Sequence, residues 1–331
     1  MSTSALRAAM VPVTRQMRAY FAPVNRTTET PTVFDPGSGT FPLSAPPSPW
    51  IDLGWIEHFE RSYSTPTDAV RSGARAVTTA QFRGPLEARL DFNFVEWGKL
   101  QMALACGSEH MNVLAPMSGS APAPSGATPA PGVAVLPGST ASELVCGPGT
   151  ASAFSAGTLL AVDVDYQQQT GYVGSGIAAA YVSSAAAVKW DPNYVRRVTF
   201  NVGRVAAVTA SSVLLAQPLP GGAPANGASA QKVLAFVDRE GGSFFQEWSG
   251  LFVAEEESGG RVCFYYPRLS SNPATKTSAS FTREELLDVA KPLSVISLKA
   301  SFVALPFTDT NDGQTVLCYR SYFPTSAAAA Y

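Results

Sequence analysis

Histidine is the side chain that most often serves as a general base, so the two histidines of the chain are the first candidates for catalysis. His58 lies in the stretch WIEHFE, between Glu57 and Glu60 and close to two tryptophans. A histidine beside a carboxylate acts as a base only where a nucleophile or substrate is positioned next to it. The chain contains no Gly-x-Ser-x-Gly motif that would supply such a nucleophile. We therefore interpret His58, and equally His110, as structural or interface residues.

Carboxylates are the next candidates, because pairs of them hydrolyse glycosides and groups of them bind divalent metals. Asp163 and Asp165 share one strand face in DVDY, and Glu255, Glu256 and Glu257 form an uninterrupted acidic run. Asp309, Asn311 and Asp312 crowd the turn DTNDG, but the twelve-residue spacing of a calcium loop is missing there. The chain also contains no phosphate-binding or dinucleotide-binding glycine motif. The sequence therefore predicts no catalytic residue, no cofactor and no metal site.

Composition limits the classes of partner. The formal net charge is −2 and no basic stripe is present, so tight nucleic-acid binding through neutralised phosphates is not expected. The four cysteines are scattered without zinc-ligand spacing, which indicates free thiols in a reducing cytoplasm. Arginines interrupt the N-terminal segment, which lacks the apolar core of a signal peptide, and we expect no membrane anchor.

Two adjacent segments have clear periodicity. In LEARLDFNF (86–94), every second residue is apolar and the intervening residues are charged or polar, which predicts a half-buried antiparallel strand. The following stretch, EWGKLQMALACG, has helical periodicity and ends at Gly107, a residue that commonly terminates helices. We expect this helix to cover the sheet that contains the strand.

The middle of the chain changes composition abruptly. Residues 111–162 contain one charged residue, Glu143, and residues 116–148 contain seven prolines. Such a stretch is typical of a connector, so we predict a linker over 116–157. Short β-rich runs follow, and they predict a small inserted β domain over 158–232.

The two ends of the chain differ in character. Residues 1–49 begin with a predicted short amphipathic helix and continue as a proline-rich arm, which is either disordered or docked on a neighbouring subunit. After residue 232 the pattern predicts a long hairpin around the turn ESGG, and a helix over 283–291 that begins with a capping box. A final pair of strands is predicted around the turn DTNDG.

This order of elements resembles that of bacteriophage tail tube proteins, also called major tail proteins, including the tube subunits of phage-like particles. The similar stretches in the first half are WIDLGWIEHF and FRGPLEARLDFNFVEWGKLQMALACGS. Those in the second half are FVDREGGSFFQEWSGLFV, SLKASFVALPF and GQTVLCYRSYF. They place the tube core in 50–115 and 233–331, and they leave 116–232 as an insertion that the family pattern lacks.

The resemblance implies a mainly β fold, an antiparallel β-sandwich or barrel of the tail-tube type with one or two covering helices and an inserted small β domain. It implies no enzyme activity. Subunits of that family form hexameric rings, which stack into a hollow tube for genome passage. The implied partners are further copies of the chain and other tail proteins (tape measure, terminator, and distal tail or sheath proteins), while DNA passes only transiently through the lumen. The implied location is the virion tail, after assembly in the host cytoplasm.

Within such a tube, long loops such as 62–84 would reach the next ring, and the insertion would lie on the outer surface. Charged and aromatic residues near the opening strand, the long loop and the hairpin tip would contact neighbouring subunits. These interface candidates are Trp50, Leu53, Trp55, Glu57, His58, Glu60, Arg71, Arg75, Arg83, Glu255, Glu256 and Glu257.

Two other functions remain open at this point. The chain could be a virion decoration or adhesion protein that binds a glycan or a host surface through aromatic residues of the inserted domain, such as Tyr166, Tyr172 and Trp190. A hydrolase that uses Asp163, Asp165 or the Glu255–Glu257 run is the weaker alternative.

Overall fold

The structure is a computed structural model that describes residues 14–25, 28–35, 43, 46–47, 49–72, 77–96, 98–107, 109–115, 130–163, 179–180, 201–239, 247–256, 260–272 and 298–323. The chain divides into two compact units: unit 1 (Met1–Val24, Pro31–Trp97 and Glu247–Tyr331) and unit 2 (Asn25–Thr30 and Gly98–Gln246). Both units consist largely of antiparallel strands, so the predicted mainly β fold is confirmed.

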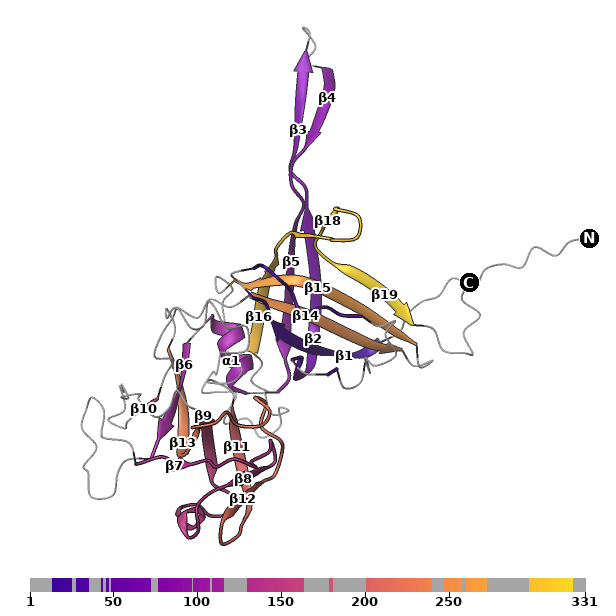
Figure 1. Ribbon diagram of the computed structural model, residues 1–331. Coiled ribbons are helices and arrows are strands. Elements are labelled where there is room, and N and C mark those ends of the chain that lie inside the picture. Colours follow the sequence, from indigo (N-terminus) through magenta and orange to yellow (C-terminus); the bar gives the residue numbers. More distant parts are fainter. Residues whose placement is uncertain are drawn as a thin grey trace, which may run out of the picture. The chain divides into compact units, whose positions relative to one another are not determined.

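Unit 1 contains a closed barrel of six antiparallel strands (Figure 1). Around the barrel the strands are β14 (Glu247–Glu256), β1 (Thr14–Pro23), β2 (Ile51–Ser64), β5 (Glu87–Phe94), β16 (Leu298–Ala304) and β15 (Arg261–Ser271). The barrel closes because β14 pairs with both β1 and β15. On its other side, β15 pairs first with β19 (Tyr319–Phe323) and then with β16. Closure satisfies most strand edges within the chain itself.

Aromatic side chains fill the interior of the barrel. Phe92, Phe252 and Phe302 are each at most 1% exposed, and the ring centroids of Phe92 and Phe302 lie 5.7 Å apart in a stacked arrangement. Gly250 lies in the same interior, where a Cβ atom would come within 2.5 Å of Leu269 Cδ1. The interior is therefore a packed core and not a channel.

A second apolar layer covers the opposite face of β1, β14 and β15. Its buried members are Tyr20, Ala22, Phe34, Trp50, Leu251, Val253, Cys263 and Tyr265. The rings of Phe34 and Trp50 lie 5.8 Å and 6.3 Å from the ring of Tyr265. The Tyr265 hydroxyl also donates a hydrogen bond to the carbonyl of Thr32 at 2.8 Å. Residues 31–35 are thereby held against the strands of their own chain.

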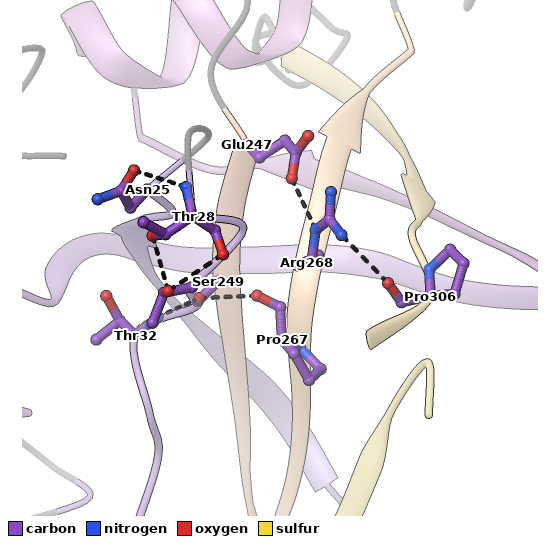
Figure 2. A network of polar contacts seen from close by, with 9 residues as sticks. Asn25, Thr28, Thr32, Glu247, Ser249, Pro267, Arg268 and Pro306 are labelled. Carbon is purple, nitrogen blue, oxygen red and sulfur yellow. Dashed lines mark hydrogen bonds and ion pairs between the residues drawn. The ribbon is translucent and has the colours of Figure 1, made fainter. Parts of the chain in front are cut away.

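Buried polar groups strengthen this attachment (Figure 2). Ser249 is fully buried; its Oγ accepts a hydrogen bond from the Thr32 backbone N–H at 2.9 Å and donates one to the Pro267 carbonyl at 2.8 Å. Nearby, Arg268 Nε donates to Glu247 Oε2 at 2.8 Å and ties β15 to β14. These bonds are made between buried or half-buried partners, where they contribute more than they would at an open surface.

The structure corrects the expectation for the N-terminal arm, 1–49. Residues 14–23 form the barrel strand β1 instead of a helix or a free arm, and 31–35 lie on their own barrel and not on a neighbouring subunit. Ala19 through Ala22 are all buried, because β1 has a strand on each side and apolar layers on both faces. Residues 1–13 and 36–42 lie outside the described part of the chain.

Unit 2 is built on one antiparallel sheet in the order β10, β6, β13, β9, β11, β12 and β8, with β7 pairing to β13. The elements are β6 (Glu109–Leu114), β7 (Val133–Ala134), β8 (Glu143–Val145), the 3-10 helix η2 (Thr150–Ala153), β9 (Leu159–Asp163), β10 (Ala179–Ala180), β11 (Val202–Val208), β12 (Ser212–Leu215) and β13 (Ser229–Arg239). Leu144, Leu160, Val162 and Val213 are fully buried in a core of its own.

Unit 2 differs from the predicted linker and insertion. Residues 130–157 were expected to belong to a linker over 116–157, yet they contain β7, β8 and η2 and bury Cys146 and Ala151 in the core of unit 2. The unit also includes β6 and β13, which lie partly or wholly outside the predicted insertion over 158–232. Residues 116–129 lie outside the described part of the chain.

The predicted helix forms as α1 (Lys99–Cys106), but it packs against β6 and β13 within unit 2 and not, as we expected, on the sheet that contains β5. Gly107 ends it as predicted, with φ 59° in the left-handed region and its backbone N–H bonded to the carbonyl of Ala103. At the first turn, Lys99 Nζ donates a hydrogen bond to Asn112 Oδ1, and burial lowers the pKa of the Lys99 amine to about 7.

Other local predictions are also confirmed. In β5, Leu90, Phe92 and Phe94 are buried, while Leu86 precedes the strand and is exposed. β14 and β15 form the predicted hairpin. The predicted turn forms, with Gly313 at φ 72°, and the short strands β17 (Phe307–Thr308) and β18 (Thr315–Val316) flank it. The longer segments that we expected to pair around it, LSVISLKASFVAL and TVLCYRSYF, contain β16 and β19, which both pair with β15 and not with each other. The helix predicted over 283–291 lies outside the described residues.

Among the residues described, no helix is both long enough and apolar enough to cross a membrane.

Candidate assembly surface

A two-stranded ribbon projects from one end of the barrel of unit 1 (Figure 1). Its strands, β3 (Thr67–Ser72) and β4 (Val77–Arg83), continue from β2 and lead into β5, and they pair with each other in antiparallel fashion. We expected 62–84 to be a long loop, and its described part is instead a hairpin. Within the described chain neither ribbon strand has a second strand partner, so both outer edges present backbone donors and acceptors.

The base of the ribbon is fixed by close backbone contact. The Gly84 N–H donates to the carbonyl of Pro66 at 2.8 Å, and a Cβ atom on Gly84 would lie 3.0 Å from Pro66 Cγ. Pro66 has a fixed φ and no N–H, so it marks the point where the barrel ladder between β2 and β5 gives way to the ribbon ladder.

Exposed apolar side chains concentrate along the ribbon and its base. Tyr63 is 72% exposed, Val70 46%, Phe82 63% and Leu86 52%, and these are four of the ten large hydrophobic residues exposed in the described chain. A solvated hairpin usually carries polar side chains, so the apolar ones along this ribbon and at its base indicate a surface that another molecule covers. We call these four residues the ribbon patch.

The charged residues predicted for the long loop lie on the same ribbon. Arg71 on β3 and Arg83 at the end of β4 are both exposed, as is Asp68, which pairs in register with Phe82. Arg75 lies outside the described residues. Arg71 and Arg83 therefore accompany the ribbon patch, where they would form part of a polar rim.

The interface residues predicted at the opening strand differ in burial: some lie in the core and others at the surface. Trp50 is 8% exposed and Leu53 1% exposed, so both pack inside unit 1 and offer no surface to another subunit, contrary to our prediction. Trp55 is half-buried beneath Arg18, whose guanidinium carbon lies 5.3 Å from the indole centroid. Arg18 Nε also donates to Asp52 Oδ1 at 2.9 Å, which fixes the cation over the ring.

His58 occupies a β-bulge. Glu57 pairs with Asn93 and Glu60 with Asp91, so β2 has one more residue than β5 across this interval. Glu57, His58 and Glu60 are all exposed, and they form the acidic and imidazole-bearing rim of β2. No nucleophile is placed beside His58 by any described contact, and its backbone position explains its presence better than general base catalysis does.

The acidic run at the hairpin tip is only partly described. Glu255 is exposed, and its carboxylate accepts a hydrogen bond from Arg261 Nε at 3.1 Å across the hairpin. The backbone of Glu256 belongs to β14, but its side chain and the whole of Glu257 lie outside the described part of the structure. Glu255 and Arg261 are an exposed pair, and such pairs contribute little to stability.

The residues of the two alternative functions are largely outside the description. These are the side chain of Asp163 and the whole of Asp165, Tyr166, Tyr172 and Trp190; the side chain of His110 also lies outside the described part of the chain. Within the described chain, no group of three or more histidine, cysteine or acidic side chains is arranged to hold a metal ion. Cys263 is fully buried, and burial raises the pKa of its thiol to about 12, far from that of a nucleophilic thiolate.

The ribbon patch was not among the predicted interface residues. A signal for it exists in TDAVRS and VTTAQFR, which contain the β-branched and aromatic residues typical of strands. The alternation that reveals a half-buried strand is missing there, because neither face of the ribbon is buried by its own chain.

No protein-family model matches the chain, and no curated protein matches it significantly.

Proposed function

We propose that the chain is a structural subunit of the tail tube of a phage or phage-like particle, forming stacked hexameric rings around a lumen for genome passage. The observation that carries the proposal is the ribbon, which combines an exposed apolar patch with two unpaired strand edges on a barrel whose own core is already filled. Within this proposal the chain has no catalytic role.

Contact with a partner would stabilise the ribbon more than contact with its own barrel does. A two-stranded hairpin in water is marginally stable by itself, and β3 and β4 have no covering layer within the described chain. Burying Tyr63, Val70 and Phe82 against a neighbour would stabilise both the ribbon and the assembly. A projecting element that docks at a different place on the next copy makes a heterologous contact, which generates a closed ring when the rotation between copies closes and an open filament when it does not.

The charge of the chain is compatible with a conduit for DNA. A net charge of −2 provides no excess of cations to hold phosphates by counterion release. A genome could therefore slide past the subunits without being retained. At its ends, the tube would meet other tail proteins of the tape-measure, terminator, and distal tail or sheath classes, as the resemblance implies.

Electron microscopy of the purified full-length chain tests the proposal. We expect rings and stacked tubes in negative stain, and a mass well above that of one chain in light scattering at high protein concentration. A chain that stays monomeric at every accessible concentration would refute the proposal.

A pair of matched ribbon variants tests the surface that carries the proposal. Val70→Lys with Phe82→Lys should abolish rings, because two charges replace apolar contacts of the ribbon patch. Thr78→Lys with Gln81→Lys adds the same charge at exposed polar positions of the same ribbon and should assemble more like the wild type. Equal loss in both variants would indicate a general charge effect, whereas loss in neither would exclude the ribbon patch from the interface.

A further inference from the structure

A cavity of about 420 Å³ lies in unit 1, where β2 ends and β5 begins. Its walls come from β2, from the start of β5 and from residues 315–320. This volume is within the range of small-molecule sites, which are mostly apolar and contain a few placed polar groups. Two of its lining residues are arginines, Arg61 and Arg320.

Arg61 is held in place by aromatic residues of the barrel. Its Nε donates a hydrogen bond to the hydroxyl of Tyr266, a residue that is 1% exposed. Its guanidinium carbon lies 4.7 Å from the ring centroid of Phe264 and 5.6 Å from that of Tyr266. A guanidinium fixed in this way is oriented before any ligand arrives, which reduces the entropy lost on binding.

Arg320 reaches the same place from the other side of the cavity. It is the direct partner of Phe264 in the pairing of β19 with β15, and directly opposed residues of antiparallel strands point to the same face. Both arginines therefore flank Phe264. Cys318 also lines the cavity, and the pKa of its thiol reflects both arginines. Burial raises this pKa, and the positive charges of Arg61 and Arg320 oppose that rise.

The cavity contains two cations without an acidic wall. Among the described residues that line it, none is aspartate or glutamate; Glu87 and Asp312 are nearby in sequence but are not lining residues. Two positive charges in one concavity repel each other, and a bound oxyanion would offset that repulsion through charge-assisted hydrogen bonds. Leu86, Val316 and Leu317 supply an apolar wall beside the cations.

We propose that this cavity binds a small organic anion, with an oxyanion head on Arg61 and Arg320 and an apolar body against Leu86, Val316 and Leu317. The head group is a carboxylate or a phosphate, and both bind guanidinium groups in bidentate geometry. The apolar wall favours an alkyl anion over an inorganic one. The proposal does not rest on tube assembly, although the cavity shares Tyr63 and Leu86 with the ribbon patch.

Isothermal titration of the full-length protein tests the proposal with four probes: octanoate, octyl phosphate, inorganic phosphate and 1-octanol. We expect one alkyl anion to bind at one site per chain, at least about tenfold more tightly than 1-octanol or inorganic phosphate. The comparison of octanoate with octyl phosphate shows which head group the arginines select.

Charge-neutralising variants locate the site. Arg320→Gln should weaken binding of the alkyl anion about tenfold or more, because it removes one cation from an exposed position that the fold does not require. Arg89→Gln is the matched control: Arg89 is exposed on β5, next to the lining residue Ala88 but on the other strand face, and its loss should leave binding unchanged.

Three results would overturn the proposal: no binding of either alkyl anion, equal binding of 1-octanol, or equal affinities for the Arg320→Gln and wild-type proteins. If small anions fail to bind while Arg320→Gln weakens association between copies of the chain, the cavity instead receives a carboxylate from another subunit.

Discussion

At the scale of single residues, His58 owes its place to backbone geometry. It has φ 53°, one of two positive values recorded for non-glycine residues in the described chain. The bulge at His58 changes the phase of β2, so that Ile56 points inward before it and Phe59 after it. Phe59 thereby reaches Phe252, with ring centroids 4.9 Å apart, and Arg61 reaches its cavity.

The effect of substitutions at His58 on stability should depend on how readily the new residue adopts positive φ, and not on the loss of the imidazole. Glycine adopts positive φ without steric cost, so His58→Gly should raise the free energy of unfolding by up to about 1 kcal/mol. His58→Val should lower it by about 1–2 kcal/mol, because a β-branched side chain is strained in this region. Urea unfolding measures both changes. Equal stability of the valine variant and the wild type would contradict this account.

Lys99 makes stability depend on pH through its buried amine. Its pKa is lowered to about 7 in the folded chain, whereas an unfolded lysine titrates at about 10.4. Between these values the unfolded state binds more protons, so the free energy of unfolding should rise with pH, by roughly 1–3 kcal/mol across that window. Below about pH 7 the lysine is protonated in both states, and the reduction that its buried charge causes in the free energy of unfolding is at its maximum.

Lys99→Met should flatten the pH profile, because it removes the titrating group while keeping a long side chain. The measurement is urea unfolding from pH 7 to pH 9.5, read as the difference between variant and wild type so that other groups cancel. Lys232→Met, at an exposed position on β13, is the matched control and should keep the wild-type slope. A rise that persists in Lys99→Met would assign the pH dependence to another group.

At the scale of elements, the ribbon and the barrel have separate roles. β3 and β4 pair only with each other in the described chain, and the barrel ladder between β2 and β5 ends at Ser64 and Glu87. The barrel core includes no ribbon residue. The ribbon should therefore be removable without loss of the fold that carries it.

Replacing residues 65–86 with Asn-Gly, which forms a tight hairpin turn, should change the free energy of unfolding of unit 1 by no more than about 1 kcal/mol. The same deletion should abolish rings in negative stain if the proposed function is right. Circular dichroism with urea unfolding gives the first result and microscopy the second. A large loss of stability would show that the ribbon is needed for the barrel to fold.

Elements were predictable from the sequence where one face is buried and the other solvated. Leu90, Phe92 and Phe94 reveal β5 by alternation, and Gly107 marks the end of α1. β1 shows no such alternation, because Ala19–Ala22 are all buried and form a continuous run of apolar residues. The short strands of 130–157 were hidden by proline and glycine, which mark turns but do not exclude strands between them.

The candidate surface and the cavity were harder to predict than the strands. The bulge at His58 moves Arg61 to the inner face, and no local pattern in WIEHFERS indicates an extra residue in β2. Arg61 and Arg320 meet only because β15 pairs with both β14 and β19, and such pairings between distant segments depend on closure of the whole barrel.

At the scale of the whole molecule, each unit has a core of its own, and the two should respond separately to mutation. Phe302→Ala should destabilise unit 1 by about 3–5 kcal/mol, and Leu144→Ala should destabilise unit 2 by about 2–5 kcal/mol, since both side chains are fully buried. In differential scanning calorimetry we expect two transitions, each lowered by one variant only. A single transition lowered equally by both variants would show that the units unfold together.

The position of β1 between β2 and β14 determines the order in which the chain can fold during translation. The ribosome completes β1, β2 and β5 first, as a three-stranded open sheet whose edges are β1 and β5. Their partners β14 and β16 follow only after all of unit 2 has been synthesised. Through that interval both edges are open to other nascent chains, so the cell must protect an unfinished barrel while an entire second unit is made.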